Sequence, residues 1–412
     1  MSHLIGFAGI TLVLLITAIF SLRWPKVSRI LYVGLLIRII FIILDNYFIA
    51  LPDSSHDADT FETLAWNWSK GGFFNVFNYY TGPNYNFISW ILAILYSLIG
   101  ERSVMLTQSV SLFFGIGTIF LGWLLANKIW DEKIALKVGW CIALFPSLIL
   151  YSCLTLREIY ISFFLLVALF GAVSWSKDNN IKSIVIAFIG FTAVTFFHSA
   201  MIVGGITFFS LVLFENLKKS FRALYNLRIN IISIIILISF IILFIFYNAG
   251  LINLDLDYFN KKIDVEKIIR EIHNRQGGDG AYPEWTKPDT AFELFYKAPL
   301  RIIYFLFSPF PWDVSKFSHI IGLFDSIFYI WLFCLIIFNL KEIFLNPQIR
   351  IIFYILMSFL LVFGIVIGNF GTSIRHKTKF VVAIILLAGP KLPFFIFKKN
   401  NRLKNLINNK YK

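Results

Sequence analysis

The stretch that decides the fold is residues 229–247, which read INIISIIILISFIILFIFY and contain no charged side chain. An α-helix of about 20 predominantly apolar residues crosses the hydrocarbon core of a lipid bilayer. Residues 104–126, 320–340 and 350–368 are similarly long and apolar. These stretches predict membrane-spanning helices at several places along the chain.

The composition of the whole chain excludes a soluble protein. Its 412 residues are 58% hydrophobic and only 15% charged, and the mean hydropathy is +0.77. A soluble domain carries about 25% charged residues, because it needs a charged surface around its core. The first apolar segment, residues 4–22, lacks a preceding basic region and a following A-x-A-like cleavage site. We therefore expect a mature helix there.

The chain has a net charge of +14, and the positions of its basic residues predict which loops lie on which side of the membrane. The basic residues lie in short loops between apolar segments, so we expect no nucleic acid partner. Clusters of Lys and Arg mark the cytoplasmic side of a membrane protein. Three such clusters occur, at residues 23–29, at residues 218–228 and in the tail 398–412. Placing them inside puts the remaining loops outside, at residues 51–103, 152–158, 248–319 and 369–377 and at the turn near residue 198.

Two apolar segments are too short or too irregular to cross the membrane. Residues 86–99 are too few for a span, and residues 300–312 are interrupted by two prolines. We expect both segments to lie at the membrane interface. The predicted fold is therefore all-α, a polytopic membrane helical bundle with about 11 spanning helices. It forms a single membrane domain, residues 1–412, with a first external loop at 51–103 and a second large external loop at 248–319.

The first external loop carries a pair of carboxylates, Asp57 and Asp59, beside His56. A carboxylate in such a loop can act as a general base toward a hydroxyl nucleophile. Two carboxylates together can also hold a divalent cation through oxygen ligands. The same acidic stretch is typical of helix N-caps, so a capping role is an alternative of equal weight.

Two further groups of charged side chains are expected on the same face of the membrane. Arg157 and Glu158 directly precede an apolar run, where anchoring of the helix at the interface is the alternative to a role in a site. Arg375, His376 and Lys377 precede another span, and three adjacent basic or titratable groups can bind a phosphate or pyrophosphate. These three also depart from the positive-inside tendency, which favours a functional role.

Several segments occur in an order that points to a known family. An acidic first external loop is followed by an interfacial segment, and two spans then lead to a second acidic position. The segments are His56-Asp57-Ala58-Asp59, Leu98-Ile99-Gly100-Glu101, Phe145-Pro146-Ser147, Phe307-Ser308-Pro309-Phe310-Pro311-Trp312 and Gly371-Thr372-Ser373-Ile374-Arg375-His376-Lys377. In this arrangement the chain resembles the C-type glycosyltransferases, polytopic membrane enzymes that include protein O-mannosyltransferases and aminoarabinose transferases. The similarity is to the bacterial branch that acts on surface polysaccharides, and the chain departs from it where Arg157 stands beside the acidic Glu158.

The resemblance implies a glycosyltransferase of the hexosyltransferase type. It implies a polyprenyl-phosphate-linked or pyrophosphate-linked sugar donor and a glycan or lipid-linked acceptor. It also implies a multi-pass protein of the bacterial inner (cytoplasmic) membrane whose active site faces the periplasm or the exterior.

The same resemblance assigns roles to the charged residues. Asp57 or Asp59 is the catalytic base that deprotonates the acceptor. A divalent cation, Mg²⁺ or Mn²⁺, is held by Asp59 and Glu158. The donor phosphate is bound by the basic groups, namely Arg375, His376, Lys377 and Arg157.

Two other activities fit parts of the same sequence. A repeat-unit polymerase for O-antigen or capsule shares the many spans, a large external loop and basic residues for a lipid pyrophosphate. A flippase for lipid-linked oligosaccharides predicts polar residues along the helices and an internal repeat. The spans carry few charges, such as Arg38 and Asp45, and no repeat of fixed period is visible in the sequence. The transferase is therefore the favoured interpretation, with the polymerase as its main alternative.

Overall fold

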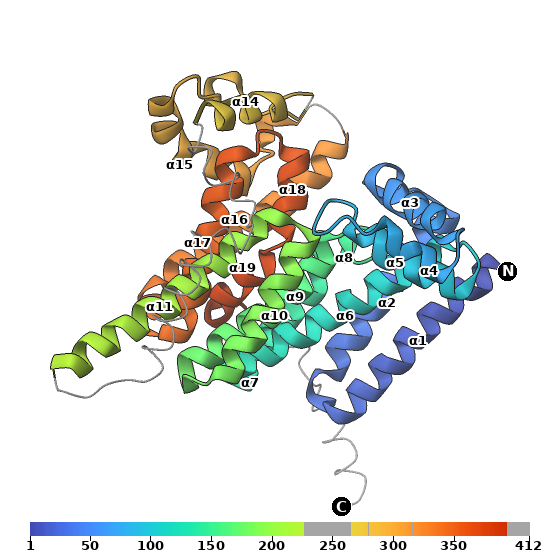
Figure 1. The fold of residues 1–412 in the computed structure, drawn as a ribbon, viewed down its shortest axis with the longest axis horizontal. Helices are drawn as coiled ribbons and strands as arrows, with labels where there is room; N and C mark the ends of the chain where they lie inside the picture. The colour runs from blue at the N-terminus through green and yellow to red at the C-terminus, as the bar shows by residue number, and fades with distance from the viewer. Residues whose placement is uncertain (226–264, 279, 315–316, 394–412) are drawn as a thin grey trace, which may run out of the picture.

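The protein is helical throughout the part that the structure, a computed structural model, describes (Figure 1). Besides helices, the described residues contain an isolated β-bridge between Ala281 and Asn369. The all-α prediction is confirmed. The expected span at 229–247 and the basic tail at 398–412 lie outside the described residues, which are 1–225, 265–278, 280–314 and 317–393.

Seven of the described helices are long and apolar enough to cross a membrane, which confirms the predicted polytopic bundle. They are α1 (Ser2–Arg23), α2 (Pro25–Tyr47), α6 (Val104–Ile129), α9 (Glu158–Asp178), α11 (Ile202–Tyr225), α16 (Phe317–Leu345) and α17 (Pro347–Val366). The expected number of about 11 also includes the span at 229–247, which lies outside the described residues, and apolar helices that are shorter than a full span. These are α7 (Glu132–Leu144), α8 (Pro146–Tyr151), α10 (Ile181–Phe197) and α19 (Val381–Ala388).

Helices α7 and α8 form one interrupted path through the bundle. Helix α7 ends because Pro146 disfavours the helical conformation of the residue before it, and Phe145 is accordingly extended. The buried guanidinium of Arg38 bridges the interruption from α2. It donates hydrogen bonds to the carbonyl oxygen of Ala143 at 2.9 Å and to the hydroxyl of Ser152 at 2.7 Å. The interruption thereby places residues 152–158 at the mouth of α9.

The loops gather at two opposite ends of the bundle. At one end, Lys26 in the α1–α2 region lies 2.5 Å from the carboxylate of Glu132 at the start of α7. At the other end lie α3 (Asp59–Ser69), α5 (Phe87–Ile99), α14 (Val265–Arg275) and α18 (Phe370–Thr378), as the upper part of Figure 1 shows. This grouping agrees with the predicted division of the loops into two sets. We call the end with α3 and α18 the site end.

The predicted first external loop, residues 51–103, folds into short helices that pack on one another. It contains a five-residue π-helix at Ser54–Ala58, then α3, α4 (Phe73–Val76) and α5. Helix α5 packs against α3 and buries one side, and its placement at the membrane interface stays a prediction. Glu62 of α3 holds α3 and α5 together. Its carboxylate accepts a hydrogen bond from the Tyr96 hydroxyl of α5 at 2.6 Å and forms an ion pair with Arg102 at 2.5 Å.

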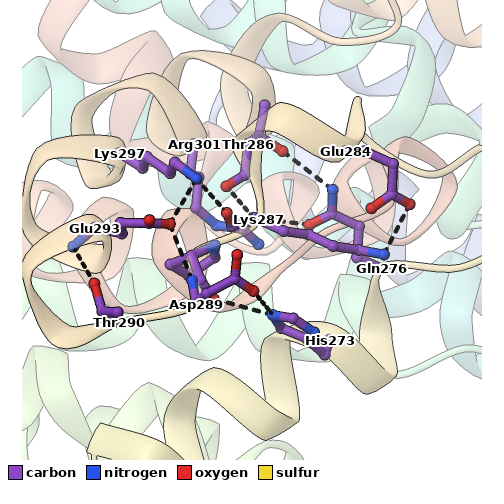
Figure 2. Close-up of polar contacts among 11 residues, drawn as sticks. His273, Gln276, Glu284, Thr286, Lys287, Asp289, Thr290, Glu293, Lys297 and Arg301 are labelled. Atoms are coloured by element: carbon purple, nitrogen blue, oxygen red, sulfur yellow. Dashed lines mark hydrogen bonds and ion pairs between the residues drawn. The ribbon is translucent and has the colours of Figure 1, made fainter.

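The described part of the predicted second external loop is held against α17 by a buried arginine. Arg301 lies on α15 (Ala291–Phe307), and its side chain is fully buried. It donates hydrogen bonds to the carbonyl oxygens of Ile365 at 2.7 Å and Ile367 at 3.0 Å and to Gln276 at 2.9 Å. Figure 2 shows Arg301 and Gln276 at the centre of a polar network that joins α14, the turn after it and α15.

The segment at 300–312 differs in part from its prediction as an interfacial element. Its first half is the end of α15, where Tyr304, Phe305 and Leu306 are buried and the helix packs on α17. The helix ends at Phe307, and a short 3₁₀ helix follows at Pro311–Asp313. Apolar side chains on this half have a buried partner in α17, so this half packs into the bundle.

Candidate functional site

Three charged side chains from distant parts of the sequence meet at the site end. Arg375 of α18 donates one hydrogen bond to the carboxylate of Asp57, which lies 318 residues away. Its second terminal nitrogen lies 3.4 Å from Oε1 of Glu158, at the start of α9. The Glu158 side chain is almost fully buried, whereas that of Asp57 is 35% exposed. The guanidinium therefore links a buried carboxylate to one that a substrate can reach.

Helix α18 sets the position of Arg375. The helix begins after Asn369, whose side-chain oxygen accepts hydrogen bonds from the backbone N–H groups of Gly371 and Thr372 and caps it. Lys379 lies four residues after Arg375, and residues four apart share one face of a helix. Its Nζ is 4.0 Å from Oε1 of Glu158. Sequence reasoning missed Lys379, although the four-residue spacing from Arg375 indicates it.

Arg157 brings a second guanidinium to the same place. Its Cζ lies 4.3 Å from the ring centroid of Tyr85, a cation–π contact, and it donates a hydrogen bond to the carbonyl oxygen of Phe197 at 3.2 Å. Tyr85 also makes a hydrogen bond with Asp57. The first loop carries many aromatic residues, and the sequence contains no signal that singles out Tyr85 among them. We call Asp57, Tyr85, Arg157, Glu158, Arg375 and Lys379 the ionic cluster.

The contacts in the ionic cluster shift the pKa values of its members. Burial raises the pKa of Asp57, but hydrogen bonds from Tyr85 and Arg375 and the nearby positive charges outweigh burial and lower it. Burial and the hydrogen bond to Asp57 raise the pKa of Tyr85 to about 12. Burial lowers the pKa of Lys379 well below its ordinary value. At neutral pH the Asp57 side chain is therefore an ionised carboxylate and the Tyr85 side chain a neutral hydrogen-bond donor.

Several polar atoms of the ionic cluster lack partners. The Nε atoms of Arg157 and Arg375 and Oε2 of Glu158 are buried and have no hydrogen-bond partner among the described residues. A buried donor without a partner is costly, and each needs a ligand or water to satisfy it. Two guanidinium N–H groups without a partner suit an anion such as a phosphate.

Of the predicted phosphate-binding residues, Lys377 points away from Arg375, and His376 touches the ionic cluster through Lys379, whose Nζ lies 3.2 Å from its Nδ1. Lys377 is fully buried on the other side of α18, where its Nζ lies 4.0 Å from Asp325 and 3.2 Å from the carbonyl oxygen of Leu306. The ring of His376 lies against that of His198 at 5.2 Å, and burial lowers the pKa of His376 well below its ordinary value. A helix with 3.6 residues per turn cannot present three successive side chains on one face.

The second carboxylate of the predicted pair also lies apart from Arg375. Asp59 is the first residue of α3, is exposed, and has Arg102 as a charged neighbour. In the described part of the chain, no three His, Cys, Asp or Glu side chains gather into a metal site. The carboxylates of Asp57 and Glu158 face the guanidinium of Arg375 instead. A cation held by Asp59 and Glu158 stays a prediction, and we assign it no step.

A cavity of about 650 Å³ adjoins the ionic cluster. Ile374, next to Arg375, contributes to its wall, as does Tyr151, whose hydroxyl donates a hydrogen bond to Asp53 at 3.0 Å. Arg375 and Glu158 are among the charged groups near the same hydroxyl. The largest part of the wall is apolar. The cavity thus offers space for a ligand within reach of the charged groups.

Comparison with known proteins gives a single structural likeness to report. No protein-family model matches the chain, and no curated protein sequence matches it. The fold is similar to a solved structure described as the archaeal oligosaccharyltransferase AglB from Archaeoglobus fulgidus in complex with an inhibitory peptide and a dolichol-phosphate, with a TM-score of 0.48 and 13% sequence identity. The likeness covers 94% of this chain, which spans about half of the other, 52% of its length. The proposals below rest on the residues of this chain alone.

Proposed function

We propose that the protein is a membrane glycosyltransferase that takes a sugar from a polyprenyl-phosphate or polyprenyl-pyrophosphate donor. The observation that carries this proposal is the contact of Arg375 with both Asp57 and Glu158. It places a partly exposed carboxylate beside guanidinium groups whose buried Nε–H donors lack a partner among the described residues. A base next to a phosphate-binding group is what transfer from a sugar phosphate to a hydroxyl requires.

The proposed reaction assigns a task to each side of the ionic cluster. The acceptor hydroxyl oxygen bonds to the anomeric carbon, and its proton passes to the carboxylate of Asp57. The bond from that carbon to the phosphate oxygen breaks, and its electron pair leaves with the phosphate. Arg375 and Arg157 stabilise the negative charge on this leaving group. Their effect is large because the site is mostly buried and water-poor.

The same contact explains how a weakly basic carboxylate becomes a base. Without substrate, Arg375 and Tyr85 hold the pKa of Asp57 below its ordinary value. A donor phosphate at Arg375 competes for the guanidinium and adds negative charge near Asp57. Both changes raise the pKa of Asp57. Donor binding therefore prepares the base for the acceptor.

The cellular setting follows from this chemistry as part of the proposal. The site end would face the periplasm or the exterior of a bacterial inner membrane, where lipid-linked sugars serve surface-polysaccharide biosynthesis. The partners would be the bilayer, the lipid-linked donor and a glycan or lipid-linked acceptor. A cation remains a prediction for Asp59 and Glu158.

Polymerisation of repeat units is the second candidate function. The second external loop, fixed to α17 by Arg301, stands at the same end of the bundle as Arg375. A polymerase would use such a loop to hold a growing chain, and it would use the same phosphate-binding arginines. A flippase is less favoured, because the spans carry few charged residues and no repeat of fixed period is visible in the sequence.

The proposal is tested by the surface glycan of a strain that lacks the protein. The strain is complemented with the wild type, with Asp57→Asn, or with Asp59→Asn as the matched change at the neighbouring carboxylate. We expect glycan chains that lack one sugar in the deletion and in Asp57→Asn. Collapse of the glycan to one repeat unit identifies a polymerase. An unchanged glycan in every strain overturns both functions.

A further inference from the structure

The cavity next to the ionic cluster contains a carboxylate that the proposed transfer step does not use. Asp325 of α16 contributes to the cavity wall, and only 4% of this residue is exposed. Neither of its oxygens accepts a well-formed hydrogen bond among the described residues, although the hydroxyl and the backbone N–H of Ser147, also in the wall, lie near it. Buried polar atoms without partners are rare, and each calls for a ligand or water.

The charge around Asp325 indicates what kind of ligand fits. Lys377 lies 4.0 Å from Asp325 and is not part of the cavity wall, so it offsets the charge from outside the cavity. The second carboxylate of the wall is Asp53, which already accepts a hydrogen bond from Tyr151. The wall contains no Lys or Arg in the described residues. Carboxylates only accept hydrogen bonds, so the ligand must donate them, and an anion is repelled.

The remaining surface of the cavity favours a ligand with apolar faces. Phe41, Leu150, Phe370 and Ile374 contribute apolar wall beside the carboxylates. Small-molecule sites in proteins have volumes of about 300–1,000 Å³ and combine an apolar wall with a few convergent polar groups. A sugar ring carries hydroxyl donors on its rim and C–H groups on its faces. This combination matches the cavity.

We propose that this cavity is the binding site for a neutral, hydroxyl-bearing sugar ring of the acceptor, with Asp325 as its hydrogen-bond acceptor. This inference rests on the proposed function, because it deepens that function by assigning the acceptor's chemical class and its place. Asp325 is a binding and specificity residue, since the proton of the reacting hydroxyl goes to Asp57. Tyr151 of this wall lies close enough to Arg375 and Glu158 to sense their charges, so a sugar in the cavity lies on the side of the ionic cluster.

Saturation-transfer NMR on the full chain in lipid nanodiscs tests this site directly. The probes are neutral methyl hexopyranosides and, as the anionic counterpart, methyl glucuronide. We expect transfer of saturation to at least one neutral glycoside and none to the glucuronide. Asp325→Asn should weaken binding of that glycoside about tenfold, since hydrogen bonds to a charged group are lost. Asp178→Asn, the same change at an exposed residue at the far end of α9, is the matched control.

A second variant protects the test against a folding defect. Leu150→Trp fills the cavity without changing a charge and should also abolish the signal. Wild-type signals in both Asp325→Asn and Leu150→Trp overturn the site, as does a wild-type protein that takes up no neutral glycoside. A preference for the glucuronide would contradict the assigned chemistry.

The experiment also separates this inference from the proposed function. Arg375→Gln should lose binding of a polyprenyl phosphate and keep the glycoside signal. If the wild type binds the neutral glycoside but no polyprenyl phosphate, the transferase proposal is overturned and the sugar site remains. A wild type that binds the phosphate but no glycoside sinks only the acceptor site.

Discussion

Two arginines at the same end of the bundle, Arg301 and Arg375, have opposite surroundings. Arg301 donates hydrogen bonds to the backbone of α17 and to Gln276, and none of its nitrogens lacks a partner in the described structure. Arg375 binds two carboxylates, yet its buried Nε has no partner among the described residues. A guanidinium whose donors are all used can only hold the fold together, whereas one with a free donor can also bind a ligand.

The difference extends to the neighbours of each arginine. Around Arg301 the charged groups are paired locally, as Lys297 is with Glu293 at 2.8 Å and Lys287 with Glu284 at 2.8 Å (Figure 2). Around Arg375 the residues come from four distant parts of the sequence. Charged residues that meet from distant parts of the sequence and keep polar atoms without partners are expected at a functional site. Such an arrangement lowers the stability of the fold, and it persists where the protein needs it for function.

The largest effect is expected for Asp57→Asn. Removing the base should lower transfer by about 10²–10⁴-fold, the range of general base catalysis. Transfer of a labelled sugar from a polyprenyl-phosphate donor by the purified protein measures this. Asp59→Asn, two residues away and exposed, should lose much less. Equal losses in the two variants would remove the distinction between the carboxylates.

Replacement of Arg375 by Gln should have the next largest effect. We expect about a 10²–10³-fold loss in kcat/KM, because a donor that stabilises charge in the transition state disappears. Titration of the donor in the same transfer assay separates kcat from KM. Arg375→Lys should recover only part of the loss, since Lys lacks the planar fork that bonds two groups at once. Full activity in Arg375→Gln would leave Asp57 without its proposed partner.

Arg301→Gln should instead show itself in stability. Carbonyl oxygens of α17 lose their donors, and each buried group left unsatisfied costs about 1–3 kcal/mol. The midpoint temperature of thermal unfolding in detergent should fall clearly, whereas transfer activity per folded molecule should change little. The reverse outcome, normal stability with lost activity, would mean that the two arginines do not differ in role.

The pH dependence of activity should sharpen the comparison. The pKa of Asp57 is lowered by Tyr85 and Arg375, so the free enzyme keeps its base ionised below the usual Asp value of about 3.9. The acid limb of kcat/KM should therefore lie below about pH 4 in the wild type. In Arg375→Gln the pKa of Asp57 rises, and the residual activity should fall at a higher pH. Superimposable acid limbs would exclude Arg375 as the group that sets this pKa.

The smallest effect is expected for Tyr85→Phe. Tyr85 has a pKa of about 12, so its hydroxyl is a neutral donor to Asp57 at all ordinary pH values. Loss of one such hydrogen bond is worth about 1 kcal/mol, or roughly fivefold in kcat/KM. The cation–π contact with Arg157 survives in Phe. A loss as large as that of Asp57→Asn would assign Tyr85 a direct chemical role.

The sequence predicts the fold well because hydrophobic runs alone specify membrane helices. It predicts Asp57, Arg157, Glu158 and Arg375 as site residues, and these four converge. It does not separate Arg375 from Lys377, because the helical turn that sends them to opposite sides is visible only once α18 is placed. Nor does it indicate Asp325, a single carboxylate inside an apolar run whose neighbours come from other helices.

The central claim is that Arg375 binds a lipid-linked phosphate beside Asp57. Equilibrium binding of a polyprenyl phosphate to the protein in nanodiscs tests it most directly. The wild type and Arg23→Gln, the same change at an exposed residue at the opposite end, should bind equally. Arg375→Gln should bind at least about tenfold more weakly, the loss of one charge-assisted hydrogen-bond pair. Unchanged affinity in Arg375→Gln would contradict the account.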